Sequence, residues 1–262
     1  MADFIITIRP EPDSCRDVDW LRRYQVPAIA VPVMRAEQQS FDLSDTPPFQ
    51  AIIFTSRHAV AAIAGIDGTP SIDKMAMLAA LRSLPVYAVG RRTALTARQA
   101  GFDHVTIGPG DGNALVPLMV ANLNPNAGEI LWPSASIISF DIASRLAYFG
   151  YSVRQIPVYA MVATRHISSD LPSRLAACSS AAVVAMSARS MKLFSQMLDT
   201  SQFAGFRKRI TVIASSKAIA AAAGSGWADI IVAKAPRRSR VLAIATLIHH
   251  RFGKVQRAMQ IN

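Results

Sequence analysis

The chain has 262 residues, of which 51% are hydrophobic and 17% charged, and its formal net charge is +11. This length fits about two domains with cores of their own, and this composition excludes an intrinsically disordered chain. No run stays apolar over the roughly 18 residues that cross a bilayer, and Asp3 stands where a signal peptide needs positive charge. We therefore expect a soluble, cytoplasmic protein. The cysteines and histidines lack the spacing of metal ligands, so we expect no metal site.

Short runs rich in isoleucine and valine predict buried parallel strands along the whole chain. Alanine-rich amphipathic segments between them predict helices, and this alternation of strand and helix predicts the α/β class. The glycine-rich stretch 108–112 lacks the Lys-Ser/Thr pair of a phosphate-binding loop, so we expect it to open a helix. The predicted strands are 4–8, 28–33, 51–55, 86–89 and 105–107, followed by 130–132, 153–158, 182–186, 210–214 and 230–232.

The two series of strands resemble each other in sequence, which indicates an internal duplication. The matching pairs of segments are 8–10 with 131–133, 31–34 with 156–159, 52–56 with 183–187, and 89–94 with 213–218. We therefore expect two homologous α/β lobes.

Four of the predicted strands end in small or hydroxyl residues that open a helix. The first N–H groups of such helices have no partner within the helix, and they point beyond the carboxyl end of the sheet, where open α/β folds bind ligands. Each turn is therefore a potential site for carboxylates or phosphates. A helix cap explains any single turn equally well, but four equivalent turns favour a binding cleft. The residues concerned are Thr55 and Ser56, Gly90 and Thr93, Ser187, and Ser215 and Ser216.

The positive charge is concentrated in the last third of the chain. Residues 1–166 carry 14 basic and 14 acidic side chains, whereas residues 167–262 carry 14 against 3. A basic surface attracts polyanions, which include nucleic acids, anionic membranes and polycarboxylate metabolites. For residues 207–209 a solvated surface is the simpler interpretation, and for Arg237, Arg238 and Arg240 both interpretations stay open.

Four segments together resemble the uroporphyrinogen-III synthase family in order and spacing. They are 6–10 (ITIRP), 54–56 (FTS), 86–94 (VYAVGRRTA) and 156–159 (IPVY), so the resemblance covers nearly the whole chain. It implies two flavodoxin-like, three-layer α/β lobes with parallel sheets, joined by a two-stranded linker, with the active cleft between them. It places residues 1–36 and 167–262 in a discontinuous basic lobe and residues 40–162 in the other, with linkers at about 36–39 and 163–166.

The family closes hydroxymethylbilane, an open tetrapyrrole with acetate and propionate arms, to uroporphyrinogen III. Ring D is inverted, water is lost, and no cofactor or metal takes part. The resemblance implies that Tyr159 is the proton donor to the leaving hydroxyl, although a tyrosine that only packs beside Pro157 is the alternative. It also implies that the four turns and Arg9 bind the substrate.

The chain departs from the family pattern at two places. Residues 214–218 read Ala-Ser-Ser-Lys-Ala where the family has a glycine followed by Thr-Ala, so Ser215, Ser216 and Lys217 would have to bind carboxylates there. The segment after Leu131 lacks the family's basic turn, so the hydroxyl of Ser134 would have to bind an arm instead.

Two other functions stay open. A non-catalytic relative could bind a tetrapyrrole or another anion without converting it. A nucleic-acid-binding protein ranks last, because the chain has no helix-turn-helix signature, aromatic RNA-binding motif or zinc finger. We expect a monomer without nucleic-acid or membrane partners, and leave open a transient contact with the enzyme that makes the substrate.

Overall fold

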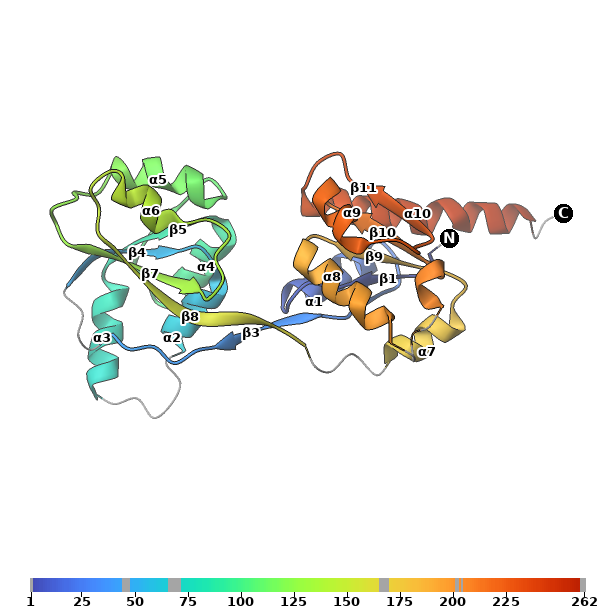
Figure 1. Cartoon of the computed structure of the whole chain (residues 1–262), viewed down its shortest axis with the longest axis horizontal. Coiled ribbons are helices and arrows are strands. Elements are labelled where there is room, and N and C mark those ends of the chain that lie inside the picture. The colour runs from blue at the N-terminus through green and yellow to red at the C-terminus, as the bar shows by residue number, and fades with distance from the viewer. Residues whose placement is uncertain are drawn as a thin grey trace. The chain divides into compact units, whose positions relative to one another are not determined.

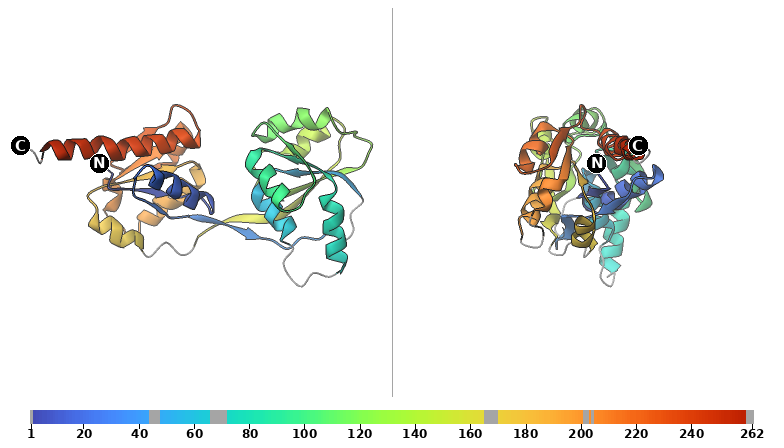
Figure 2. Two further views of the ribbon diagram at one scale, coloured as in Figure 1. Left: turned by 180° about the vertical axis from the view of Figure 1, so that it is seen from behind. Right: turned by 90° about the vertical axis from the view of Figure 1, so that its right-hand side faces the viewer.

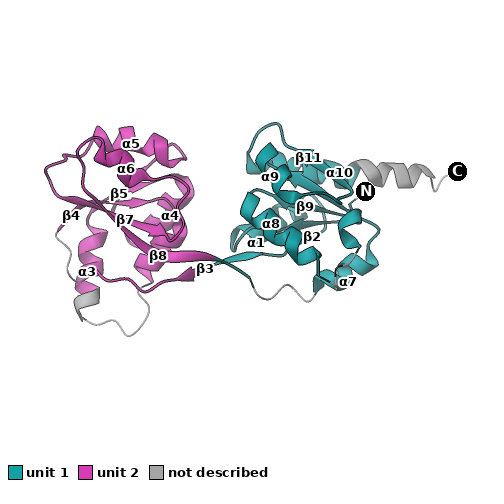
Figure 3. Cartoon of the chain, viewed as in Figure 1, with its two compact units in different colours: residues 1–35, 162–262 teal, residues 36–161 magenta. Residues whose placement is uncertain are grey.

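The computed structural model describes residues 2–43, 48–65, 72–164, 170–200, 203 and 205–259. They divide into two compact units (Figures 1 and 3): unit 1 contains residues 1–35 and 162–262, and unit 2 contains residues 36–161. The chain passes from one unit to the other within β3 (Met34–Gln38) and again within β8 (Val153–Ala163). The second expected linker and the start of the lobe after it include residues 165–169, which lie outside the described residues.

Unit 1 contains a parallel five-stranded sheet in the order β11-β10-β9-β1-β2. Helices α1 and α10 cover one face, where Leu21 and Leu242 join Ile5 and Ile213 in one buried cluster, and α8 and α9 lie on the other (Figures 1 and 2). The strands are β1 (Phe4–Thr7), β2 (Ala28–Ala30), β9 (Ala181–Ala185), β10 (Ile210–Ala214) and β11 (Asp229–Val232). The helices are α1 (Asp13–Arg23), α7 (Asp170–Ala177), α8 (Ala188–Leu198), a 3-10 turn (Phe206–Arg209), α9 (Lys217–Ala223) and α10 (Arg238–Met259).

Unit 2 contains a six-stranded sheet in the order β3-β8-β7-β4-β5-β6, in which the pairs from β8 to β6 are parallel. One face packs on Val60, Ile63 and Ala97 from α2 and α4, and the other packs on Leu115 and Leu146 from α5 and α6. These three layers confirm the predicted α/β class. The remaining strands are β4 (Phe49–Phe54), β5 (Pro85–Ala88), β6 (His104–Ile107) and β7 (Glu129–Ala135). The helices are α2 (Arg57–Ala64), α3 (Ile72–Arg82), α4 (Arg91–Gln99), α5 (Gly112–Val120) and α6 (Ile142–Ala147).

The predicted strands are present, but they are not all buried. Strand β6 forms one edge of the sheet of unit 2, and β11 forms one edge of the sheet of unit 1. The side chains of both strands are exposed or half-buried. An edge strand has a neighbour on one side only, so its isoleucines and valines are less completely covered. The polar strand β3 was not predicted, because only Met34 in it is buried.

The strand order of unit 1 recurs in unit 2, as an internal duplication predicts. Strands β2-β1-β9-β10-β11 of unit 1 correspond in order to β8-β7-β4-β5-β6 of unit 2. Along the chain, β1, β2, β4, β5 and β6 therefore form one repeat, and β7 to β11 form the other. Each unit combines the first two strands of one repeat with the last three of the other, so neither repeat builds a sheet alone.

Two of the sequence matches are displaced by two residues from the matches that strand pairing gives. Residues are equivalent here when they pair with equivalent residues of the neighbouring strand. Ile52 pairs with Leu131, and the equivalent Val183 pairs with Ile6, so Leu131 corresponds to Ile6 and not to Ile8. In the same way, Phe54 pairs with Ala88 and Ala185 pairs with Ala214. Ala214 is therefore the counterpart of Ala88.

Gly108 lies directly after β6, where the chain passes close to the end of β5. Its N–H donates to the carbonyl oxygen of Ala88 at 2.7 Å. A Cβ at this position would lie 2.9 Å from that oxygen and 2.6 Å from Cδ1 of Leu115. We predict that Gly108→Ala lowers the free energy of unfolding by about 1–3 kcal/mol, because the added methyl overpacks the site. Urea denaturation measures this change.

Gly90 is the matched control for this substitution. Its backbone is extended, with φ of −166°, and an added Cβ would meet only Cα of Gly110 at 3.5 Å, an ordinary contact. Gly90→Ala should therefore leave the midpoint of denaturation nearly unchanged. Equal midpoints for the two variants would contradict the prediction for Gly108.

Candidate functional site

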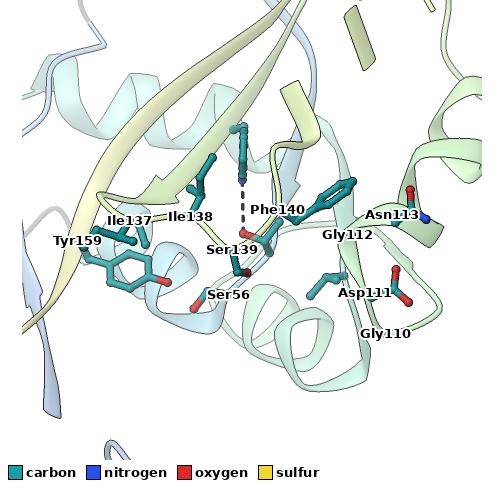
Figure 4. A pocket seen from close by; sticks show the side chains of 14 residues that line it. Ser56, Gly110, Asp111, Gly112, Asn113, Ile137, Ile138, Ser139, Phe140 and Tyr159 are labelled. Carbon is teal, nitrogen blue, oxygen red and sulfur yellow. Dashed lines mark hydrogen bonds between the residues drawn. The ribbon is translucent and has the colours of Figure 1, made fainter. Parts of the chain in front are cut away.

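A hollow of about 460 Å³ opens at the carboxyl-terminal edge of the sheet of unit 2 (Figure 4). Parallel α/β sheets bind their ligands at this edge. The lining comes from the ends of β4, β5 and β7, from β8, and from the loops after β6 and β7. The lining residues are Thr55, Ser56, Val89, Gly110, Asp111, Gly112, Asn113, Trp132, Ala135, Ile137, Ile138, Ser139, Phe140 and Tyr159.

Tyr159 combines a buried ring with a hydroxyl at the hollow. Its side chain belongs to the core cluster around α2 and is 8% exposed, and its ring lies 5.5 Å from that of His58. The hydroxyl points toward Ser56 (Figure 4). Burial raises the pKa of Tyr159, and a smaller opposing effect comes from its hydrogen bond with the Ser56 hydroxyl. The phenol is therefore protonated at neutral pH and can donate a proton.

Thr55 and Ser56 reach the same hollow because β4 ends at Phe54 and α2 begins at Arg57. Ser56 is the N-cap of α2, and its hydroxyl accepts the N–H of His58 at 3.1 Å. The hydroxyl of Thr55 accepts the indole N–H of Trp132 at 3.4 Å (dashed in Figure 4). The structure thus brings together three of the predicted residues, Thr55, Ser56 and Tyr159.

Gly90, Thr93 and Ser134 are not among the residues that line the hollow. Gly90 is the N-cap of α4 and lies beside Gly110, whereas Thr93 is buried within α4. Ser134 corrects an expectation: it lies inside strand β7, is fully buried, and accepts the side-chain N–H of Gln155 at 3.0 Å. Its hydroxyl satisfies an interior amide and does not lie in a turn.

In the turns of unit 1, serine hydroxyls already accept hydrogen bonds from the first N–H groups of the helices that follow. Ser187 accepts the N–H of Ser190 at 3.3 Å, and Ser216 accepts the N–H of Ile219 at 3.4 Å. Ser215 is buried and its N–H donates to the carbonyl of Ala185, while Lys217, the first residue of α9, is exposed.

The corrected register changes the interpretation of the turn at residues 214–218 of unit 1. Ser216 and Gly90 are both N-caps and are equivalent, so a serine replaces the glycine at that position. Ala214 is the last residue of β10 and corresponds to Ala88, so it does not occupy the position of that glycine.

Arg9 is engaged within unit 1, contrary to the expectation that it binds substrate. Its guanidinium pairs with Asp13 and with the fully buried Asp17, which also pairs with Arg238. Arg207 donates to the carbonyl oxygen of Ser195 at 2.7 Å. Arg209 likewise donates to the carbonyl oxygens of Cys178 and Leu175, so these basic side chains have structural roles beyond a solvated surface.

Two loops in the lining were not predicted as site residues. The glycine-rich loop opens α5 at Gly112, as expected, and the side chain of Asp111 accepts the N–H of Ala114 at 2.8 Å. The second loop, which contributes residues 137–140, has no periodic pattern that would identify it. In the described part of the chain, no cluster of histidine, cysteine and acidic side chains could hold a metal ion. None of its helices is long and apolar enough to cross a membrane.

Comparison with known proteins gives consistent matches. The family model "Uroporphyrinogen-III synthase HemD" matches residues 18–243. The uroporphyrinogen-III synthetase of Helicobacter pylori is 19% identical, with a TM-score of 0.63 over 95% of this chain and 100% of that one. A mutant uroporphyrinogen III synthase from the extremely thermophilic bacterium Thermus thermophilus is 15% identical, with a TM-score of 0.47 over 99% and 100%. No curated protein sequence matches. At 19% identity, the Helicobacter structure shows a common fold.

Proposed function

The chain belongs to the uroporphyrinogen-III synthase family, and we propose that it closes hydroxymethylbilane to uroporphyrinogen III in tetrapyrrole (haem) biosynthesis. Ring D is inverted and water is lost in this reaction. The observation that carries the proposal is the position of the Tyr159 hydroxyl, which lies beside Ser56 at a hollow of the sheet's carboxyl-terminal edge. The proposed enzyme is a cytoplasmic monomer that needs no cofactor, and units 1 and 2 are its basic lobe and its second lobe.

The proposed chemical step begins at the hydroxymethyl group of the substrate. The C–O bond breaks, the hydroxyl leaves as water with the phenolic proton of Tyr159, and the pyrrole nitrogen supplies electrons to give an azafulvenium cation. The substituted carbon of ring D then attacks this cation, and the bond that joined the same carbon to the methylene of the neighbouring ring breaks, which leaves a second azafulvenium cation there. The unsubstituted carbon of ring D attacks the second cation, and the proton that this carbon loses returns to the phenolate. General acid catalysis of this kind contributes about 10²–10⁴-fold.

The charge distribution supports a polycarboxylate substrate. Unit 1 has 20 lysine and arginine residues against 8 aspartate and glutamate residues, whereas unit 2 has 8 against 9. Several arginines of unit 1 are engaged internally, but Lys217, Arg237 and Arg240 are exposed. A basic field of this kind raises the association rate of an anionic ligand. We propose that it attracts the arms of hydroxymethylbilane.

A non-catalytic tetrapyrrole-binding protein is the second candidate. It is favoured by the internal bonding of Arg9 and Ser134, which removes two of the expected substrate contacts. Such a protein would bind a tetrapyrrole without changing the course of its cyclisation.

The product isomer tests the proposed activity. Unaided hydroxymethylbilane closes without inversion to the type I isomer, so the purified protein should give mainly type III from fresh substrate, without added metal or nucleotide. Chromatography of the oxidised porphyrins measures the ratio, with heated protein as the control. A ratio equal to that control would disprove the activity, and tetrapyrrole binding with the control ratio would support the second candidate.

A further inference from the structure

The hollow of unit 2 is lined by one charged side chain, and this side chain is acidic. Asp111 is that residue, and no lysine or arginine from the described ranges contributes to the lining. Much of the remaining wall is apolar or aromatic, with Trp132, Ile137, Ile138 and Phe140. A carboxylate arm placed here would lie near another carboxylate without a countercharge, and it would lose part of its hydration. Both effects disfavour the arms in this hollow.

A pyrrole ring matches this lining. Its faces are apolar and aromatic, and its polar group is a single N–H donor. Such a ring packs favourably on aromatic and aliphatic walls, and hydrogen bonds from N–H groups to a carboxylate are stronger than bonds between neutral groups. The hollow, at about 460 Å³, is within the range of about 300–1,000 Å³ that is typical of small-molecule sites.

We propose that the hollow binds the pyrrole rings of the substrate, that Asp111 accepts a hydrogen bond from a pyrrole N–H, and that the carboxylate arms stay outside. This inference rests on the proposed function. It differs from the expectation for Thr55 and Ser56, because unit 2 would bind pyrrole rings at this hollow and not the carboxylate arms.

The position of Asp111 separates the pyrrole that it contacts from the pyrrole that reacts. The hydrogen bond found for it in the described part of the chain is accepted by Oδ1, from Ala114, so Oδ2 can accept from a ligand. Asp111 and Tyr159 lie on opposite sides of the hollow (Figure 4). The pyrrole whose N–H donates to Asp111 is therefore not the pyrrole that carries the hydroxymethyl group, to which Tyr159 donates its proton. Asp111 is a binding residue that orients the substrate, and Tyr159 is the proton donor.

Asp111→Asn tests the inference through the sign of its effect. Asparagine keeps the helix cap and removes the charge. The probe is a dipyrromethane that carries acetate and propionate arms, titrated into the full-length protein by calorimetry. We expect the dissociation constant to rise about tenfold, because a charged acceptor is replaced by a neutral one. If the hollow bound the arms instead, the loss of a like charge would tighten binding. Unchanged or tighter binding, or no binding to the wild type, overturns the inference.

Asp141→Asn is the matched control. Asp141 caps α6 as Asp111 caps α5, accepting the N–H of Ser144 at 3.0 Å, but it does not line the hollow. Its substitution should leave the dissociation constant of the probe unchanged. An equal loss in both variants would mean that the effect comes from the helix caps, and would overturn the inference.

An N-methylated form of the same dipyrromethane identifies the donor. Methylation should weaken binding to the wild type about tenfold, and should cause little further loss in Asp111→Asn, because both changes remove the same hydrogen bond. Independent losses that simply add would overturn the inference. These titrations need no turnover, so their failure is distinguishable from a failure of the type III product assay.

Discussion

Tyr159→Phe is expected to slow formation of the type III product about 100-fold while leaving the protein folded. The substitution removes one hydroxyl from the hollow and keeps the ring that packs in the core around α2. Because the spontaneous reaction competes with the slower enzymatic one, the proportion of type I isomer should rise. Initial rates with fresh hydroxymethylbilane measure the loss, and circular dichroism checks the fold.

Tyr87→Phe is the control for removing a buried tyrosine hydroxyl from unit 2. Tyr87 lies on β5, and burial raises its pKa as it does for Tyr159, but it does not line the hollow. We expect its rate to stay within about twofold of the wild type. A Tyr159→Phe enzyme as fast as Tyr87→Phe would remove Tyr159 from the mechanism.

The pH dependence follows from the direction of the shift in pKa. An unperturbed tyrosine has a pKa of about 10, and burial moves the pKa of Tyr159 upward from this value. The acid form therefore persists throughout the range from neutral pH to about 10. Because more than half of this phenol is then protonated, its ionisation cannot lower the rate of the wild type by half below that limit.

The strands were predictable because the sheets are buried, and the exceptions have the same physical cause. Runs such as that of β4 are apolar because neighbours and helices cover them on all sides. Strand β3 has a single strand neighbour, and its mostly polar sequence gave no signal. The register of the repeats could not be obtained from residue likeness, since the shared proline in 8–10 and 131–133 aligns residues that do not occupy equivalent positions.

Part of the site was also predictable. Thr55 and Ser56 follow a buried strand and open a helix, a local pattern that places them at the edge of a sheet. The role of Asp111 was not predictable, because it depends on a loop after β7 that comes from a distant part of the chain. The engagement of Arg9 had a partial signal in Asp13 and Asp17, which are four residues apart on one face of α1. The second arginine that pairs with Asp17, Arg238, had no such signal, because it is 221 residues away in the chain.

Asp17→Asn is expected to lower the free energy of unfolding of unit 1 by about 3 kcal/mol. Asp17 is fully buried on α1 and joins two arginines from separate elements, Arg9 after β1 and Arg238 at the start of α10. Asparagine keeps the shape, but it removes the carboxylate that pairs with Arg238, leaves Arg9 with Asp13 alone, and turns an amide donor toward both guanidinium groups. Urea denaturation measures the loss, and hydrogen exchange with mass spectrometry should locate it in peptides of α1 and α10.

Asp199→Asn is the matched control, because the same arginine–aspartate chemistry occurs there at the surface. Asp199 pairs with Arg207 at 2.7 Å, but the Asp199 side chain is 62% exposed, so water already solvates much of its charge. After the substitution Arg207 keeps its hydrogen bonds to the carbonyl oxygens of Ser195 and Ser225. We expect a loss of at most about 1 kcal/mol. In the Asp17→Asn background, Arg238→Gln should cost less than it does in the wild type, since the charge that Asp17 balanced is then already unpaired. Equal losses for Asp17→Asn and Asp199→Asn would mean that burial does not strengthen the interaction.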